Sequence, residues 1–324
     1  MKTTKVLLLT MIAFLATAVL PGGEAVAAAK KKQAAAKKHV VAKKIKARKH
    51  VAYRPGQRLV LIEAQEDANG NPLLRSAAVV VQDQTTGMVM FEKNSDAVLP
   101  IASITKLMTA MVTLDAGLDL RETLSIGETD IDTQRGSRSR LPVGLGLSRE
   151  DMLRLALMSS DNRAAHSLSR HYPGGLPAFI TAMNRKAKTL GLPETRFFDP
   201  TGLSAANVSS ARDLVKLVDA SSRYPLIREL STTPEYTVTI NGREQTFRNS
   251  NLLVRDSSWE ISLSKTGFIK ESGKCLVMQT WLNSKPVIIV LLDSWGRLTR
   301  IGDANRIKKW IENASLPQRT PGAV

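Results

Sequence analysis

Residues 100–112 read PIASITKLMTAMV, and they hold the most informative pattern in the chain. After Ser103, apolar residues recur at the spacing of one helix face, so we expect a helix over residues 103–116. Ser103 and Lys106 stand three residues apart at its start, which puts the hydroxyl and the ammonium on one face where they can meet. Such a pair can join a nucleophile to its base. The alternative is that Ser103 caps the helix and Lys106 lies on the surface of its first turn.

Apolar runs typical of strands lie on both sides of this helix. The runs cover residues 77–83, 88–91, 236–240, 244–247, 261–264, 275–282 and 286–292. Helical patterns lie between them and at the end of the chain, over residues 148–158, 161–170, 176–190, 210–222 and 300–312. This order predicts an α/β fold of the α+β kind. Its antiparallel sheet takes its edge strands from the two ends of the chain and packs against helices, and an all-helical region is added to it.

A second motif, Ser160-Asp161-Asn162, separates two of the helical patterns. We expect it on the turn between the helices, where its side chains can point into a cleft. The alternative is that Ser160 or Asp161 only caps the following helix, and Asp161 can do so even if its neighbours are catalytic.

A third motif, Lys265-Thr266-Gly267, is predicted to end the strand at residues 261–264. Since Gly267 has no side chain, a substrate peptide could run close along this strand, and Lys265 and Thr266 would offer a charge and a hydroxyl to a carboxylate. The alternative is a surface turn. For Lys106 to act as a base, its pKa must be lowered by burial and by nearby positive charge, which Lys265 and helix N–H groups would supply.

The three motifs in this order resemble those of the active-site serine penicillin-recognising superfamily, whose fold is β-lactamase/transpeptidase-like. The resemblance is closer to the low-molecular-mass D-alanyl-D-alanine carboxypeptidases and endopeptidases of serine peptidase family S11. It covers roughly residues 59–310. The stretches that support this branch are Leu99–Ala102, Met158–Asn162, Phe198–Leu203 and Ser264–Phe268.

The resemblance implies a role for each motif residue. Ser103 attacks a D-Ala-containing peptide bond to form an acyl-enzyme, Lys106 takes its proton, and Ser160 relays a proton to the leaving amine. Substrate binding falls to Asn162, Lys265, Thr266 and Gly267, and the oxyanion hole to the backbone N–H groups of Ser103 and Phe268. The implied partners are peptidoglycan stem peptides and, as covalent inhibitors, β-lactams. No metal or cofactor is implied, because the four histidines form no motif with acidic residues at ligand spacing.

Four functions remain open within this resemblance. Only residues 268–324 follow Gly267, too few for the second domain and anchor of the membrane-attached carboxypeptidases, so we expect a soluble endopeptidase of the penicillin-binding protein 7 type. A carboxypeptidase is the alternative. A class A β-lactamase is less favoured, because Glu194 lacks the Leu-Asn that follows the Glu of that class, and we interpret Glu194 as a surface-loop residue. A wall-binding protein with a vestigial site is disfavoured because all the reactive residues are present.

The beginning of the chain predicts export. Residues 1–27 combine a basic start, a short apolar run and the small-residue site Ala25-Val26-Ala27, which is typical of a secretory signal peptide. An uncleaved anchor is the alternative, but the run is short for a membrane span. We therefore expect a secreted protein, in the periplasm if the source is Gram-negative.

Most of the net charge of +17 lies in residues 28–58, which hold twelve Lys and Arg and no acidic residue. Such a segment is predicted to be a disordered tail that contacts an anionic membrane or wall, or a plain linker. Nucleic acid is not an expected partner, because the tail has almost no aromatic residues. The peptidase domain is predicted over residues 59–316 and a flexible end over 317–324. The single cysteine, Cys275, allows no intrachain disulfide and is expected to fill space in the core.

Overall fold

The computed structural model describes residues 66–314. The predicted signal peptide, basic tail and flexible C-terminal end lie outside the described residues, so these predictions stay predictions. None of the helices in the described range is both long enough and apolar enough to span a membrane.

A five-stranded antiparallel sheet organises the described chain, in the order β2-β1-β11-β10-β9. Its strands are β1 (Ala78–Asp83), β2 (Val89–Lys93), β9 (Glu260–Ile269), β10 (Gly273–Leu282) and β11 (Lys285–Ser294). Pairing of β1 with β11 joins the N-terminal hairpin to the C-terminal strands. The two edges, β2 and β9, therefore come from opposite ends of the chain, and the predicted α+β architecture is confirmed.

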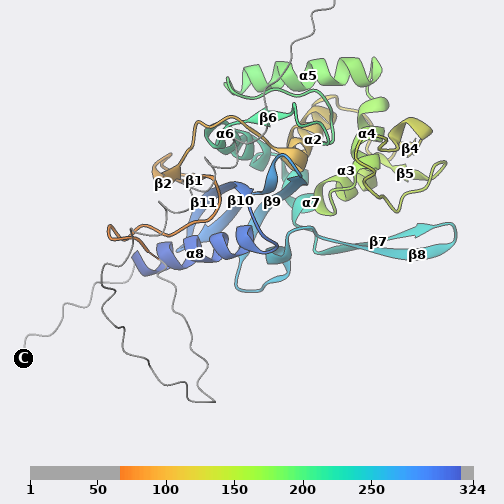
Figure 1. Cartoon of the computed structure of the whole chain (residues 1–324). Coiled ribbons are helices and arrows are strands. Elements are labelled where there is room, and N and C mark those ends of the chain that lie inside the picture. The colour runs from red at the N-terminus through yellow and green to blue at the C-terminus, as the bar shows by residue number, and fades with distance from the viewer. Residues whose placement is uncertain (1–65, 315–324) are drawn as a thin grey trace, which may run out of the picture. The chain divides into compact units, whose positions relative to one another are not determined.

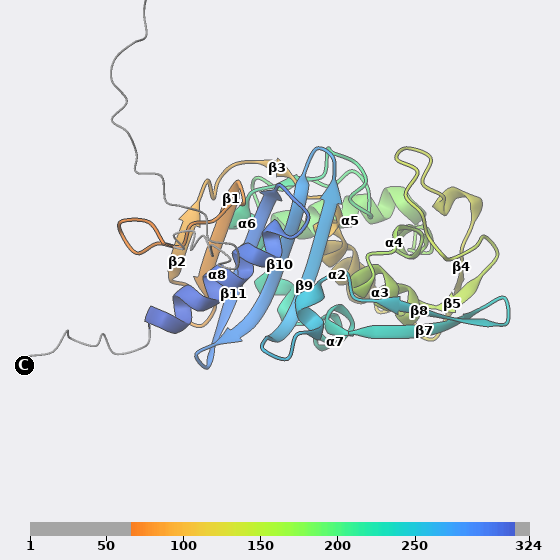
Figure 2. The ribbon, with the colours of Figure 1, turned by 60° about the horizontal axis from the view of Figure 1, so that its bottom comes forward.

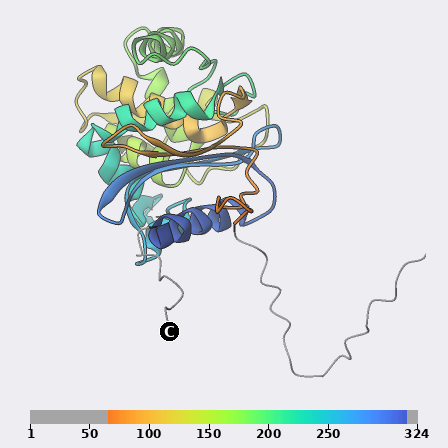
Figure 3. The ribbon, with the colours of Figure 1, turned by 90° about the vertical axis from the view of Figure 1, so that its left-hand side faces the viewer.

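Both faces of this sheet are covered, which explains why its strands read as unbroken apolar runs. Ile289 and Leu291 of β11 pack in a core that includes residues of α8 (Thr299–Ala314). The alternate residues Ile288 and Val290 face the main core on the helical side. Figure 3 shows the sheet edge-on, with α8 in dark blue on one face and the other long helices on the opposite face.

Six α-helices form the larger, helical side (Figure 1). They are α2 (Lys106–Asp115), α3 (Arg149–Met158), α4 (Asn162–Arg170), α5 (Gly175–Thr189), α6 (Ala211–Ser222) and α7 (Pro225–Thr232). Helix α7 has no counterpart among the predicted elements. It begins with Pro225 at its first position, where proline favours a helix start, and it buries Ile227 and Leu230.

Short elements complete the described fold. They are the strand pairs β3 (Leu99–Pro100) with β6 (Val208–Ser209), β4 (Thr123–Ser125) with β5 (Gly146–Ser148), and β7 (Glu235–Ile240) with β8 (Arg243–Arg248), and the 3-10 helices η1 (Ala102–Thr105), η2 (Glu128–Asp130) and η3 (Leu252–Arg255). The β7–β8 hairpin extends away from the main sheet (Figure 2). It turns at Asn241-Gly242, both of which have positive φ, as is typical of a tight hairpin turn.

Candidate active site

Ser103 lies on the 3-10 turn η1, directly before α2, and not within the α-helix that the sequence pattern predicted from residue 103. This turn is held from outside the helix, because β3 pairs with β6 and the Ile101 N–H donates to the carbonyl of Asn207 at 3.0 Å. Ala102 has a φ of 47°, which is strained for a residue with a side chain. The strain thus sits beside the proposed nucleophile and is maintained by the surrounding fold.

Lys106, the first residue of α2, is only 1% exposed and points at Ser103. Its Nζ lies 2.8 Å from Ser103 Oγ, 2.7 Å from Asn162 Oδ1 and 2.7 Å from the carbonyl oxygen of Thr201. The predicted pairing of ammonium and hydroxyl is therefore present in the geometry, and the alternative of a surface lysine is wrong.

The pKa of Lys106 is lowered to about 7, and burial is the cause. Asp199 and Asp161 oppose this shift, since negative charge favours the protonated form. We expected two causes, which were burial and positive charge from Lys265 and helix N–H groups. Burial is confirmed as the cause, whereas the expected contribution of positive charge is not found.

Ser160 and Asp161 occupy the turn between α3 and α4, as predicted. Asp161 caps α4 by accepting a hydrogen bond from the Ala164 N–H at 3.0 Å, so the capping interpretation holds for this residue. Ser160 has a φ of 62°, and its Oγ accepts a hydrogen bond from Lys265 Nζ at 2.9 Å. The second motif therefore contacts both lysines, one through Asn162 and the other through Ser160.

Lys265, Thr266 and Gly267 lie inside β9, which continues to Ile269. The prediction that the motif ends its strand is wrong. The polar residues interrupt the apolar pattern, yet the backbone stays in register with β10, where Gly267 pairs with Cys275. Cys275 is buried, as expected.

Lys265 is 1% exposed, and its pKa is well below the ordinary value because of burial, with further contributions from Lys106 and Arg300. Thr266 Oγ1 donates to Ser250 Oγ at 2.7 Å. Arg300 of α8 was missed by the sequence analysis, because nothing in its surroundings marks it. Its Nη1 reaches the carbonyl oxygens of Gly267 at 3.2 Å and Cys275 at 3.3 Å, and burial lowers its pKa.

Two glycines let separate segments approach the Ser103 turn. A Cβ atom added at Gly267 would lie 2.8 Å from the carbonyl oxygen of Ile101 and 3.1 Å from the Ser103 nitrogen. The absent side chain thus makes room for the protein's own backbone, which differs from the reason we expected. At Gly202, with a φ of +83°, an added Cβ would lie 1.9 Å from the carbonyl oxygen of Ala102.

Gly202→Ala is expected to lower the melting temperature and to slow acylation by a β-lactam about 100-fold, because the Ser103 turn must shift. Gly144→Ala is the matched control, since Gly144 has a φ of +84° but nothing within 4 Å of an added Cβ. Both variants bear the left-handed strain of about 1–2 kcal/mol, and Gly202→Ala alone bears the clash. Equal melting temperatures and acylation rates for the two variants would contradict this account.

Comparison with known proteins agrees with this geometry. Residues 65–296 match the model of the peptidase S11 family, described as D-alanyl-D-alanine carboxypeptidase. The chain belongs to this family. It is therefore a serine peptidase, and the fold and family expected from the three motifs are confirmed.

Among the relatives of this S11 peptidase, a D-alanyl-D-alanine endopeptidase of Pseudomonas aeruginosa is 52% identical over 245 residues, covering 75% of this chain and 79% of its own. One from Escherichia coli is 51% identical over 247 residues, covering 76% and 80%. A Streptomyces D-alanyl-D-alanine carboxypeptidase is 30% identical over 257 residues, covering 74% and 88%. The crystal structure of a Streptomyces DD-transpeptidase matches with a TM-score of 0.70 at 28% identity, covering 74% of this chain and 98% of that chain.

Proposed function

We propose that this S11 peptidase is a D-alanyl-D-alanine endopeptidase that hydrolyses D-Ala-containing crosslinks of peptidoglycan through an acyl-enzyme on Ser103. The observation that carries the proposal is the contact of 2.8 Å between Lys106 Nζ and Ser103 Oγ, made by a lysine whose pKa is about 7. A base with a pKa near the working pH transfers protons most effectively.

The three partners of Lys106 favour the direction of the first proton transfer. Neutral Lys106 has two N–H bonds and one lone pair. The Asn162 and Thr201 oxygens can only accept hydrogen bonds, so they take the two N–H bonds. The lone pair is left for the hydroxyl hydrogen of Ser103. Lys106 then accepts this proton as the Ser103 oxygen bonds to the scissile carbonyl carbon.

The oxyanion formed in this step would be held by the backbone N–H groups of Ser103 and Phe268. Support comes from the contact at Gly267, which brings β9 against the Ser103 nitrogen. Because β9 is an edge strand, a substrate backbone can pair along its free side. Ser160, held by Lys265, would pass a proton to the departing amine, and water would then release the acyl group.

Lys265 and Arg300 supply the basis for binding a carboxylate. Both are desolvated, and neither forms an ion pair within the described residues. A substrate carboxylate would provide negative charge beside both Lys265 and Arg300. Thr266, which follows Lys265 on β9, would offer its Oγ1 to the same carboxylate. β-Lactams, which mimic the D-Ala-D-Ala end, would use the same groups while acylating Ser103.

The choice of endopeptidase over carboxypeptidase is supported by the two relatives named endopeptidase at 51% and 52% identity, against 30% for the one named carboxypeptidase. The test is to incubate the protein with crosslinked muropeptide dimers and with pentapeptide monomers, and to weigh the products by mass spectrometry. Dimers converted to monomers would support the proposal. Intact dimers with D-Ala released from pentapeptides would identify a carboxypeptidase instead.

We also propose secretion to the periplasm and attachment of residues 28–58 to an anionic membrane or wall surface, on the basis of their twelve positive charges. Binding to isolated sacculi or anionic vesicles is then expected to weaken as salt rises. A truncated protein beginning near Arg58 should lose this binding. Equal binding by the full chain and the truncated protein would show that the segment is only a linker.

A further inference from the structure

A cavity of about 270 Å³ lies beside the proposed active site and has no role in the chemistry described above. Its lining includes Asn162 and Thr201. Each of these residues has an oxygen atom that accepts a hydrogen bond from Lys106 Nζ. It also includes His166, which follows Asn162 by one turn of α4. The cavity thus shares part of its wall with the groups that position the proposed base.

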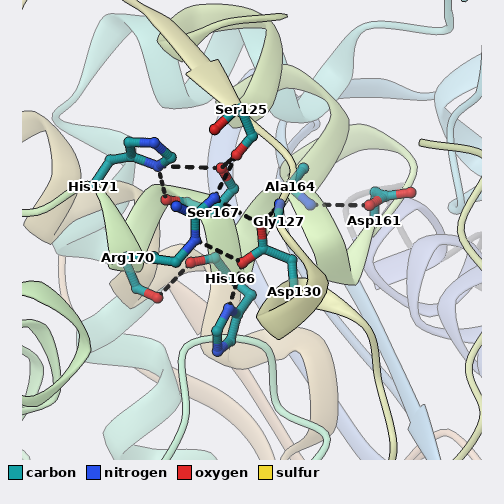
Figure 4. A network of polar contacts seen from close by, with 10 residues as sticks. Ser125, Gly127, Asp130, Asp161, Ala164, His166, Ser167, Arg170 and His171 are labelled. Atoms are coloured by element: carbon teal, nitrogen blue, oxygen red, sulfur yellow. Dashed lines mark hydrogen bonds and ion pairs between the residues drawn. The ribbon is translucent and has the colours of Figure 1, made fainter. Parts of the chain in front are cut away.

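His166 is held in one orientation by Asp130. The His166 Nδ1 lies 2.7 Å from Asp130 Oδ1, as drawn in Figure 4. Asp130 also accepts hydrogen bonds from Arg170 and from the Gly127 N–H. Burial alone would raise the pKa of Asp130, but these hydrogen bonds from His166, Arg170 and Gly127 lower it. Asp130 is therefore an ionised carboxylate that can only accept, so the Nδ1 of His166 must carry the hydrogen.

This tautomer leaves a lone pair on the other ring nitrogen, Nε2, of neutral His166. No residue in the described range 66–314 forms a hydrogen bond with that nitrogen. The side chain is 22% exposed and belongs to the cavity lining. His166 therefore offers a fixed hydrogen-bond acceptor to whatever enters the cavity.

The charge of the cavity narrows the class of ligand. Asp130, Asp132 and Asp199 are among the lining residues. The lining within the described residues includes no lysine or arginine, and Arg170, which forms an ion pair with Asp130, lies outside it. Asp132 and Asp199 already accept backbone N–H bonds, as in the 2.8 Å contact from Ser137 to Asp132, so they act mainly through their negative field. Because His166 offers a hydrogen-bond acceptor, the ligand group should be a hydrogen-bond donor, and one that carries positive charge fits this negative field best. A primary ammonium group meets both conditions, and the apolar lining residues can contact the methylene groups that lead to it.

We propose that this cavity, here called the His166 pocket, is a subsite for the ammonium end of a side chain in the peptide that becomes acylated on Ser103. The inference rests on the proposed D,D-peptidase function and adds a selective feature to its substrate. His166 accepts a hydrogen bond from the ammonium group, and Asp130 keeps the ring in the required tautomer. The subsite would favour stem peptides that carry a free side-chain amine over those in which this amine is acylated.

The test compares two crosslinked peptide dimers with the same D-Ala-containing crosslink. They differ only in a side-chain amine of the strand that acylates Ser103, which is free in one dimer and N-acetylated in the other. The parent protein is expected to show a kcat/KM about 10- to 100-fold higher for the free amine, as a hydrogen bond to a charged group supplies. In His166→Phe this preference should fall close to one. His171→Phe is the matched control, because His171 ends the same helix but does not line the pocket.

Benzylpenicillin has no such amine, so its rate of acylation should be unchanged in His166→Phe. An unchanged rate would show that Ser103 is still correctly placed in the variant. If His166→Phe does not fold, His166→Gln keeps an acceptor oxygen and should retain part of the preference. Equal rates of the parent on the two dimers, or a preference that survives in the folded variant, would overturn the subsite. No hydrolysis of either dimer by the parent would instead count against the proposed function itself.

Discussion

Ser103→Ala is expected to abolish covalent labelling by penicillin and to reduce hydrolysis of crosslinked muropeptides by at least about 10⁴-fold, as loss of a nucleophile does in other serine hydrolases. The remaining groups can still bind substrate, but no atom is left to form the acyl bond. Labelling by a fluorescent penicillin and the mass of the intact protein after incubation measure the first effect directly. The second is measured on purified dimers.

The variant should remain folded, because Ser103 is only half-buried and Lys106 keeps its contacts with Asn162 and Thr201. Ser257→Ala is a suitable control, since Ser257 is an exposed serine outside the three motifs. A penicillin adduct on folded Ser103→Ala would show that the nucleophile is another residue.

The acylation rate is expected to rise with pH around a midpoint near 7, the pKa of Lys106. Below this pH the amine is protonated and cannot accept the Ser103 proton, whereas above it the neutral form dominates. An ordinary lysine would be neutral in only about one molecule in 3,000 at pH 7. Lys106→Arg, which stays protonated, should therefore lower the acylation rate about 10²- to 10⁴-fold and remove the midpoint. The measurement is the second-order rate of β-lactam acylation between pH 5.5 and 9.

Lys216→Arg makes the same exchange at an exposed position on α6 and should leave the pH profile unchanged. Because Lys265 is also buried nearby, the observed profile belongs to both lysines, and only the loss of the midpoint in Lys106→Arg assigns it. A profile with the same midpoint in that variant would exclude Lys106 as the base.

The lowered pKa of Lys106 also has a consequence for stability. Between about pH 7 and the pKa of about 10.4 of an unfolded lysine, the unfolded chain binds more protons than the folded one. The free energy of unfolding should therefore rise with pH over this range as far as Lys106 contributes.

Short-range patterns predicted the parts of the site that depend on local geometry. Ser103 and Lys106 meet because they are three residues apart, and Asp161 caps α4 because it stands where the helix begins. The order of strands and helices was likewise sufficient to predict the sheet. Strands from the two ends of the chain must pair for both apolar faces of the sheet to be buried. Helix α7 was missed because it is short, and the role of its apolar residues is seen only from the packing of the helix against β9.

Features that depend on contacts between distant segments could not be predicted in this way. The extension of β9 through Lys265 and Gly267 is stabilised by pairing with β10, and the polar residues conceal it in the sequence. The low pKa of Lys106 follows from how completely the fold buries it. His166 and Asp130 are 36 residues apart, and no spacing rule joins them.

Cys275 gives the protein a useful property as a reagent. Its thiol is completely buried in β10, and burial raises its pKa to about 11, so it is almost wholly protonated at neutral pH and closed to maleimides. A cysteine introduced at the β7–β8 turn, for example Arg243→Cys, would then be the only reactive thiol of the folded chain. Dyes, spin labels or surface linkers could be attached there without first removing the natural cysteine.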